Sequence, residues 1–349
     1  KKIMIIYKNL KKYFISDECT IYQLIDKINL NGKKFAILIN DKKVVSGVFT
    51  DGDLRRLLSK KIDINKKIKT FSKKNFVYIS ENSLKYKKTK LNKFTEQIPI
   101  VDKDKKLKGI LLKTENHNKK LKNTVFILAG GFGKRMGKIT KKTPKPMLKI
   151  NKKPILENII LSFKKKGLKN FLISTNYLAG KISNYFGDGS LFDVNIGYIK
   201  EVFSLGTAGS LSLINKKKIA DDIIVTNGDL YGNLDYTNML NIHKKKFNDI
   251  TVCARLHTYD LPYGLITDKN EDNFLNEKPK LSYLINSGIY VLKKKLLKHV
   301  KKNTYLDMNN FLNFLKKKKY RIGVYTIYEP IHDIGNLKQY NLAKKLILK

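Results

Sequence analysis

The sequence predicts an α/β protein built from two parts of different construction. At 349 residues, the chain is long enough to bury two hydrophobic cores. From residue 124 to residue 349, strand patterns alternate with helix patterns, which indicates a sheet with helices on both faces. Residues 1–115 instead repeat a strand–turn–strand pattern, which predicts a pair of α+β modules, and residues 116–123 form the expected linker.

The composition is strongly basic. The chain has 72 Lys+Arg against 29 Asp+Glu, a formal net charge of +43. Such a charge ordinarily indicates nucleic acid or an anionic membrane as the partner. Arginine is scarce, however, and lysine runs such as 164–166 and 316–319 are typical of solvated helix faces. We therefore predict no nucleic-acid partner and no membrane partner, but an attraction for small anions that weakens with salt.

The two cysteines point to a reducing compartment. Cys19 and Cys253 are isolated, with no C-x-x-C pair, so neither a disulfide framework nor a zinc site is expected. No apolar run approaches the length of a membrane span, and the first residues lack the apolar core of a signal peptide. A cytoplasmic location fits these features.

The N-terminal part combines one clear module with a weaker copy of it. The apolar spacing after Thr20 predicts a helix with Thr20 as its N-cap. The order helix, strand, turn, strand, helix is expected at 21–28, 35–39, 44–49 and 53–59, and its strand–turn–strand part recurs at 76–79, 97–102 and 107–112. The polar segment 113–122 lacks apolar periodicity, so the domain boundary is placed there.

The stretch Val125–Gly137 is the centre of the second part. A short apolar run reads as a buried strand, and the glycines after it allow a tight loop whose backbone N–H groups face outward. Gly130, Gly131 and Gly133 would let the chain approach a triphosphate closely. The planar guanidinium group of Arg135 would bind phosphate oxygens, and the ammonium group of Lys145 would add a compact positive charge. A simple strand-to-helix turn is the alternative interpretation.

The rest of the second part alternates helices and strands. Such alternation predicts a Rossmann-like mixed sheet with ligands at the carboxyl ends of its strands. The expected elements are helices at 154–166, 177–186, 307–319 and 337–348, and strands at 171–175, 194–199, 223–227 and 321–327, with Asp307 as the cap of the third helix.

The segment Ile223–Asp229 predicts a metal ligand. Its apolar strand delivers Asp229 to the carboxyl end, where a hard, oxygen-seeking Mg²⁺ that bridges phosphates would need a carboxylate. The Asn-Gly-Asp sequence could otherwise be a hairpin turn.

These motifs together resemble the sugar-1-phosphate nucleotidyltransferases. The string A-G-G-x-G-x-R-M followed by P-K-P-M is similar to the signature of that family, and His332–Gly335 resembles its second carboxylate element. The resemblance implies that the substrates are a nucleoside triphosphate and a sugar-1-phosphate and that the cofactor is Mg²⁺. It assigns Leu128, Ala129, Gly130, Gly131 and Gly133 to the nucleotide, Arg135, Lys145 and Lys278 to catalysis, and Asp229 and Asp333 to the metal.

The segment from Glu201 to Ser210 resembles the base-recognition segment of the family, with Gly206 and Thr207 also at the nucleotide. In members that use uridine or thymidine nucleotides, glutamine commonly stands where this chain has Glu201. A carboxylate can only accept hydrogen bonds, and guanine offers adjacent N1–H and N2–H donors. The favoured nucleotide is therefore GTP, with UTP, dTTP and CTP as alternatives. Glu201 could equally be an exposed carboxylate at a strand end.

Three further pieces resemble the sugar-binding side of the family. Tyr263 and Gly264 match a Y-G pair, and Glu277 and Lys278 match an E-K-P motif. Asn286 opens an N-x-G-I-Y motif. The resemblance implies that Glu277 and Asn286 bond the hexose and that Lys278 holds the sugar phosphate. Each motif alone could simply mark a loop or turn.

The N-terminal repeat resembles a CBS pair whose second copy is degenerate. Family members often bind nucleotides through a G-x-x-T/S-x-x-D pattern, met here by Gly47, Thr50 and Asp53. The resemblance implies a regulatory nucleotide and a homodimer formed through the pair. Thr50 and Asp53 could instead simply cap the helix that follows them.

A CBS pair ahead of a transferase is similar to the glucosamine-1-phosphate guanylyltransferases of bacterial legionaminic acid synthesis. That resemblance implies formation of GDP-glucosamine and pyrophosphate from GTP and glucosamine-1-phosphate. Mannose-1-phosphate and heptose-1-phosphate remain alternative substrates. A non-enzymatic alternative is a nucleotide sensor with an inactive transferase half.

Overall fold

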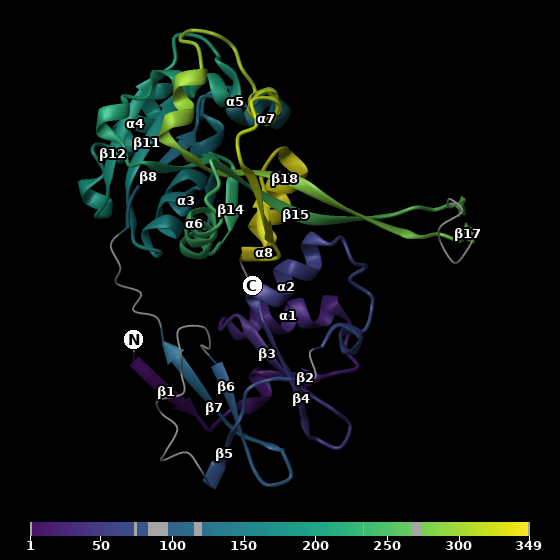
Figure 1. The fold of residues 1–349 in the computed structure, drawn as a ribbon. Helices are drawn as coiled ribbons and strands as arrows, with labels where there is room; N and C mark the ends of the chain where they lie inside the picture. The colour runs from purple at the N-terminus through teal and green to yellow at the C-terminus, as the bar shows by residue number, and fades with distance from the viewer. Residues whose placement is uncertain are drawn as a thin grey trace. The chain divides into compact units, whose positions relative to one another are not determined.

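Two units of the chain are described separately (Figure 1). The first unit comprises Lys1–Asn116 with Arg255–Ile285, and the second comprises His117–Ala254 with Asn286–Lys349. The residues that the computed structural model describes are 2–72, 75–82, 97–114, 121–232, 234–266 and 274–347. Residues 115–120, most of the predicted linker, lie outside this set. Within it, no helix is long and apolar enough to cross a membrane.

The first unit contains two three-stranded motifs of the same topology. In each motif the first strand runs parallel to the second, and the second pairs antiparallel with the third. Both hairpins have a register shift at the same place, between Leu38 and Ile39 and between Ile100 and Val101. The strands are β2 (Phe14–Ser16), β3 (Phe35–Ile39) and β4 (Val45–Thr50), then β5 (Ile79–Ser80), β6 (Gln97–Val101) and β7 (Leu107–Thr114). The predicted strand–turn–strand repeat is confirmed at 35–49 and 97–112, whereas the strand expected at 76–79 is wrong, because β5 begins only at Ile79.

The turns of the two hairpins are built alike and pair with each other. The side-chain oxygen of Asn40 accepts a hydrogen bond from Val44 N at 3.0 Å, and that of Asp102 accepts one from Lys106 N at 2.9 Å. Such Asx interactions stabilise tight turns. An antiparallel bridge between Val44 and Lys106 joins the two turns.

Two capped helices complete the first motif. The first, α1 (Ile21–Asn31), begins at a capping box formed by Thr20 and Gln23, as the sequence predicts. The second, α2 (Asp51–Ser59), begins two residues earlier than expected, with Thr50 as its N-cap. The remaining elements are β1 (Lys2–Ile6), which pairs with β7, and two short 3-10 helices, η1 (Leu10–Lys12) and η2 (Ile68–Phe71).

The second unit is built on a seven-stranded mixed sheet of order β12-β11-β8-β13-β18-β15-β19. The first four strands in this order are mutually parallel, and β18 is antiparallel to β13. The strands are β8 (Leu121–Leu128), β11 (Leu168–Thr175), β12 (Asn195–Lys200), β13 (Asp222–Asn227), β15 (Ile250–Asp260), β18 (Lys280–Lys293) and β19 (Ile322–Ile327). The predicted mixed sheet is confirmed.

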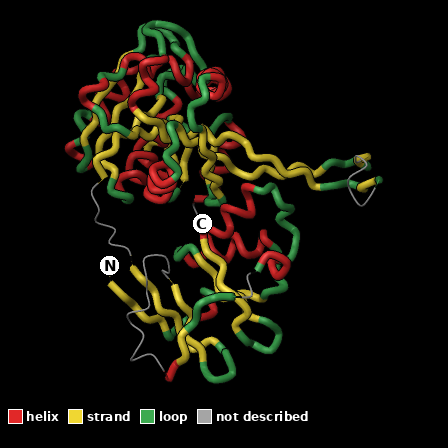
Figure 2. The backbone as a smooth tube through the Cα atoms, in the orientation of Figure 1, coloured by secondary structure: helices red, strands yellow, loops and turns green. Residues whose placement is uncertain are grey.

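Helices cover both faces of this sheet because its strands are apolar on both sides. In β8, the side chains of Val125 and Ile127 enter one core, and that of Phe126 enters the other. Figure 2 shows the strands in yellow and the surrounding helices in red. The first core takes α3 (Ile155–Lys164), α4 (Ala179–Phe186), α6 (Tyr236–Lys245) and α8 (Leu337–Ile347), and the second takes α5 (Gly206–Gly209) and α7 (Met308–Lys317).

Three two-stranded ladders could not be predicted from sequence periodicity, because each of their strands has only two or three residues. They are β9 (Lys149–Ile150) with β10 (Lys153–Pro154), β14 (Leu230–Gly232) with β20 (Ile331–Asp333), and β16 (Leu265–Ile266) with β17 (Leu275–Asn276). The second of these ladders positions a candidate site residue.

The cap of α7 differs from the prediction. Asp307 occupies the N-cap position, but its side chain makes no capping hydrogen bond. Thr207 does so instead, because its hydroxyl oxygen accepts a hydrogen bond from Met308 N at 2.8 Å. Gly206, with φ +77°, makes this approach possible, since a Cβ there would lie 2.7 Å from the Leu306 carbonyl oxygen. The N-terminus of α7 is therefore capped by a residue of α5, which is distant in sequence.

Replacing Thr207 with valine removes this capping oxygen while keeping the β-branched shape. We expect Thr207→Val to lower the free energy of unfolding of the second unit by about 1 kcal/mol, the usual contribution of a cap. Thr207→Ser keeps the hydroxyl and is the matched control, with a smaller loss. Urea denaturation followed by circular dichroism measures both, and equal losses in the two variants would contradict a capping role.

Candidate active site

The carboxyl ends of four parallel strands meet at one edge of the sheet. The register places Leu128, the last residue of β8, beside Ser174 of β11 and Asn227 of β13. After β8, the chain places β11 and β12 on one side of it and then β13 on the other side. The direction in which strands are added therefore reverses between β8 and β13. Ligands of open α/β sheets bind at such a reversal.

The glycine loop after β8 has the geometry that its sequence predicts. Gly133 has φ +65°, and a Cβ there would lie 3.2 Å from Lys145 Cβ and 3.1 Å from Thr140 Cγ2. Glycine is therefore required at this position on two grounds, backbone conformation and space. A Cβ at Gly131, by contrast, would meet nothing within 4 Å, so the loop is open there.

A partly buried ion pair joins this loop region to β13. Lys145, in the 3-10 helix η6 (Lys145–Met147), is only 8% exposed, and its Nζ pairs directly with Asp229 Oδ2. The other oxygen, Asp229 Oδ1, is buried and has no hydrogen-bond partner within the described structure. An unpartnered buried carboxylate oxygen is unfavourable by itself and is a natural position for a cation.

The second predicted carboxylate lies next to the first. The ladder between β14 and β20 places Asp333 opposite Leu230, and Ile334 N donates to the Asp229 carbonyl at 3.1 Å. The backbones of two acidic residues from distant parts of the sequence are thus neighbours, and carboxylates are the ligands that a hard cation such as Mg²⁺ prefers. No group of three or more His, Cys, Asp or Glu side chains in the described residues could hold a metal. Phosphate oxygens and water would have to complete the coordination.

Arg135 lies beside the same element. It is part of the 3-10 helix η5 (Lys134–Thr140) that follows the glycine loop. A Cβ built on Gly335 would lie 3.8 Å from Arg135 Nη1 and 3.3 Å from Asp333 Oδ1. The structure thus brings together Arg135, Lys145 and both predicted metal ligands around the loop.

His332 directly precedes the second predicted carboxylate in β20. Its ring stacks on Tyr231 across the ladder, with ring centroids 6.5 Å apart. Burial lowers the pKa of His332, which favours the uncharged ring that packs on Tyr231.

Glu201 is buried at the end of β12, with only 8% of its surface exposed. Its Oε1 accepts a hydrogen bond from the Ser174 hydroxyl, and its Oε2 accepts one from Leu205 N at 3.1 Å. A Cβ built on Gly130 would lie 3.3 Å from the same Oε1, so the carboxylate borders the glycine loop. The alternative of an exposed strand-end carboxylate is wrong.

Two residues of this site were missed in the sequence. Ser174 is fully buried and orients Glu201, and Asn176 donates its amide to the Glu201 carbonyl at 2.9 Å. Asn176 Cβ also lies 3.3 Å from a Cβ built on Gly130. Their position at the carboxyl end of a predicted parallel strand was the available signal.

Gly206 and Thr207, predicted to contact the nucleotide, have structural partners. The Thr207 hydroxyl lies 3.4 Å from Asp307 Oδ1 and accepts from Met308 N. Nucleotide binding by these two residues stays a prediction.

The Asn286 motif lies beside the Asn-Gly-Asp turn. Asn286 Nδ2 donates to the Tyr290 hydroxyl at 2.6 Å, and its Oδ1 accepts from Gly288 N at 3.0 Å. Gly288 has φ +75°, and a Cβ there would lie 2.6 Å from Asn227 Nδ2. The start of the motif is thereby fixed at the carboxyl end of β13.

The other predicted sugar-binding residues belong to the segment that groups with the first unit. There Gly264 and Glu277 are neighbours, since a Cβ on Gly264 would lie 3.0 Å from Glu277 Oε2. Tyr263 is 72% exposed, and Lys278 has a positive φ of 47°. Their predicted roles at the sugar phosphate stay predictions.

The Thr50 and Asp53 side chains form a capping box at the start of α2. Asp53 Oδ2 accepts from the Thr50 hydroxyl at 2.5 Å and from Thr50 N at 3.1 Å. Burial acts to raise the pKa of Asp53, but hydrogen bonds from Thr50 and Arg56 hold it below its usual value. Capping by this pair is confirmed, whereas a nucleotide site that also includes Gly47 stays a prediction.

Comparison with known proteins places the second unit among nucleotidyltransferases. The family described as "Nucleotidyl transferase" matches residues 124–349. The D-glycero-alpha-D-manno-heptose 1-phosphate guanylyltransferase of Campylobacter jejuni is 32% identical over 223 residues, which are 62% of this chain and 96% of that protein. A UTP--glucose-1-phosphate uridylyltransferase of Synechocystis is 29% identical over 64% of this chain and 63% of its own length. Mannose-1-phosphate guanylyltransferases of Sulfolobus acidocaldarius, a putative one, and of Mycobacterium tuberculosis are matched over half of their own length.

The solved structures include a similar one with a bound nucleotide analogue. HddC from Yersinia pseudotuberculosis, solved in complex with GMP-PN, matches with a TM-score of 0.52 and 26% identity. The match covers 64% of this chain and 99% of that protein.

Removing the Ser174 hydroxyl tests how Glu201 is held. We expect Ser174→Ala to lower the free energy of unfolding by about 1–3 kcal/mol, because a buried carboxylate loses a donor. Ser183→Ala removes a half-buried hydroxyl that donates only within α4, to the Gly180 carbonyl at 3.3 Å, and is the control; it should change stability by less than about 0.5 kcal/mol. A double-mutant cycle with Glu201→Gln should show coupling. Additive effects in that cycle would show that the Ser174–Glu201 hydrogen bond contributes nothing.

Proposed function

The chain belongs to the nucleotidyl transferase family, and from this premise we propose that it transfers a nucleotidyl group from a nucleoside triphosphate to a sugar-1-phosphate. In this reaction a phosphate oxygen of the sugar-1-phosphate attacks the α-phosphorus of the triphosphate. The new P–O bond forms as the bond to the β-phosphate oxygen breaks, and pyrophosphate leaves. No covalent enzyme intermediate is required.

The observation that carries this proposal is the pairing of Asp229 with Lys145 beside Asp333. The orphaned Asp229 Oδ1 gives a cation a ligand at the sheet edge where the glycine loop begins. Bound Mg²⁺ would supply charge neutralisation for the phosphates there. Lys145 and Arg135 would bind the phosphate oxygens from the protein side, and Gly131 would leave their approach open.

We propose GTP as the nucleotide because the base-side carboxylate is held as an acceptor. Ser174 and the Leu205 amide each use one lone pair of Glu201, so each oxygen keeps another. Guanine N1–H and N2–H could donate to these oxygens, whereas uracil presents a single N–H between two acceptors. Guanylyltransferases among the relatives agree with this choice, although a uridylyltransferase also occurs among them.

We propose glucosamine-1-phosphate as the sugar substrate and legionaminic acid synthesis as the pathway. Their support is the resemblance in domain order, a CBS-like pair ahead of a transferase. The repeated hairpins of the first unit support the CBS interpretation because their turns pair as related copies. A regulatory nucleotide at Gly47, Thr50 and Asp53, and a homodimer through the pair, belong to the same proposal. Mannose-1-phosphate and heptose-1-phosphate are the competing substrates.

Pyrophosphate release across a grid of nucleoside triphosphates and sugar-1-phosphates, with Mg²⁺, tests the function. We expect the highest rate with GTP and glucosamine-1-phosphate. A maximum with another pair of substrates would support the reaction type but show that the proposed substrates are wrong. Folded protein that releases no pyrophosphate in any cell would overturn the activity and favour a nucleotide sensor.

Asp229→Asn serves as the control for that grid because the amide keeps the shape but loses the charge. We expect a loss of turnover of at least about 100-fold with the fold intact. Unchanged turnover in the folded variant would contradict the assignment of the site.

Changing Glu201 to glutamine should relax the choice of base. The amide replaces an acceptor with a donor, so we expect the preference for GTP over UTP, measured as a ratio of kcat/KM, to fall by roughly 10- to 100-fold. The Ser183→Ala variant should keep the original ratio. If Glu201→Gln left the ratio unchanged, Glu201 would not face the base.

A further inference from the structure

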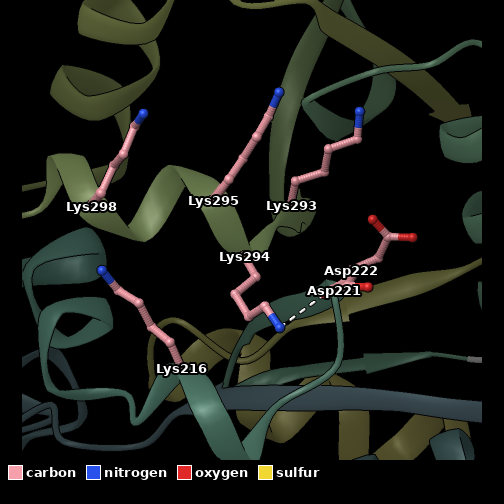
Figure 3. A pocket seen from close by; sticks show the side chains of 7 residues that line it. All are labelled: Lys216, Asp221, Asp222, Lys293, Lys294, Lys295 and Lys298. Carbon is pink, nitrogen blue, oxygen red and sulfur yellow. Dashed lines mark ion pairs between the residues drawn. The ribbon is translucent and has the colours of Figure 1, made fainter.

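A second candidate site lies at the opposite end of the sheet from Asp229 (Figure 3). Strand β13 begins at Asp222 and ends at Asn227, and Asp222 pairs with Lys293 at the end of the antiparallel β18. A cavity of about 520 Å³ opens at this end. We call it the basic pocket, and its lining residues are Lys216, Asp221, Asp222, Lys293, Lys294, Lys295 and Lys298.

The lysines of the basic pocket are positioned by two short helices. The 3-10 helix η10 (Lys294–His299) buries Leu296 and Leu297, so the lysines before and after this pair face outward. Lys295 and Lys298, three residues apart, emerge in the same direction (Figure 3). Lys216 approaches from η9 (Lys216–Lys218), whose first turn is capped by Asn215. Five lysines line the cavity together with Asp221 and Asp222 (Figure 3).

The acidic residues near the pocket are already paired. Lys294 pairs with Asp221 at 2.9 Å. Lys293 and Lys295 share Asp249, at 3.4 and 2.7 Å.

Two of the lysines lack a counter-charge. Within the described residues, neither Lys216 nor Lys298 has an ion-pair partner. They approach the cavity from separate helices, η9 and η10. The pocket therefore keeps an excess of positive charge on two sides.

Asp222 interacts with a residue of the core rather than with the lysines of the basic pocket. His243 is fully buried, and its Nε2 lies 3.5 Å from Asp222 Oδ1. Its other ring nitrogen, Nδ1, lies 2.8 Å from Thr251 Oγ1. Hydrogen bonding to His243 lowers the pKa of Asp222, and Lys244 approaches its other oxygen at 3.6 Å. The negative charge of Asp222 is thus compensated from behind, and the lysines remain available to a ligand.

We propose that the basic pocket binds the diphosphate group of a small anion, at a site separate from the candidate active site. Ammonium groups on two sides of one cavity match an anion with two linked phosphates better than a single small ion. A volume of about 520 Å³ also admits the sugar and base of a nucleotide. The diphosphate could come from free pyrophosphate or from a nucleoside diphosphate. This inference does not depend on the proposed activity.

Lysine acetylation mapped by mass spectrometry tests the proposal on the full chain. The probes are inorganic pyrophosphate and GDP, each without Mg²⁺ and at constant ionic strength. We expect either probe to slow acetylation of Lys216 and Lys298 by roughly fivefold or more, because a bound anion masks the ammonium groups. The exposed Lys165, which follows α3, and Lys345, on α8, should react at unchanged rates. Equal slowing at all four lysines would overturn the proposal, because it would show only general screening.

The two probes also separate the sources of the diphosphate. Protection by both, or by pyrophosphate alone, supports recognition of the diphosphate group. Protection by GDP alone would overturn it, because the base and sugar would then carry the binding.

A double variant provides an independent measurement. Lys216→Gln with Lys298→Gln should weaken pyrophosphate binding at this site by roughly tenfold, followed as the loss of protection at Lys295. Lys165→Gln with Lys345→Gln makes the same change in net charge away from the pocket and should leave that protection unchanged. Thermal unfolding checks that both variants are folded. Equal protection of Lys295 in the two variants would contradict the proposed site.

Discussion

The ion pair between Lys145 and Asp229 is the interaction on which the candidate active site depends. It joins the loop after β8 to the end of β13 in a partly buried position. Burying two charges is unfavourable unless each is compensated, and removal of one partner leaves the other exposed to that penalty. Lys145 compensates only one oxygen of Asp229, because the other has no hydrogen-bond partner within the described structure. We infer that this is the resting arrangement and that a cation bound with the phosphates takes over part of the role of Lys145.

The topology of the sheet explains why so many polar groups reach one edge. Strands β8, β11, β12 and β13 are parallel, so their carboxyl ends coincide, and the two-stranded ladder of β14 and β20 adds Asp333 from much later in the chain. The opposite edge collects lysines on short helices instead. A single strand, β13, therefore has the proposed cation ligand Asp229 beyond one end and a lysine-lined pocket at the other. At the second of these positions, the high net charge of the chain takes the form of a local cluster of lysine side chains.

Local patterns predicted most elements because their signals are short in range. The N-cap at Thr20 and the short apolar run of β8 depend on neighbours in sequence, and both occur as expected. The resembled motifs located Lys145 and Asp229, but their direct pairing depends on tertiary structure. Ser174 carried no motif, and its role follows only from the register of β11 against β8. The capping of α7 by Thr207 could not be predicted for the same reason, since the two residues in contact are distant in sequence.

The direct test of the central claim is the affinity of the free protein for Mn²⁺, measured by electron paramagnetic resonance in wild type and in Lys145→Met. If Asp229 is a metal ligand held by Lys145, removing the ammonium group should raise Mn²⁺ affinity without nucleotide by about tenfold or more. Lys142→Met, on the exposed loop before it, makes the same change in net charge and should have little effect. An affinity that is unchanged or lower in Lys145→Met, or that rises equally in Lys142→Met, would contradict the account.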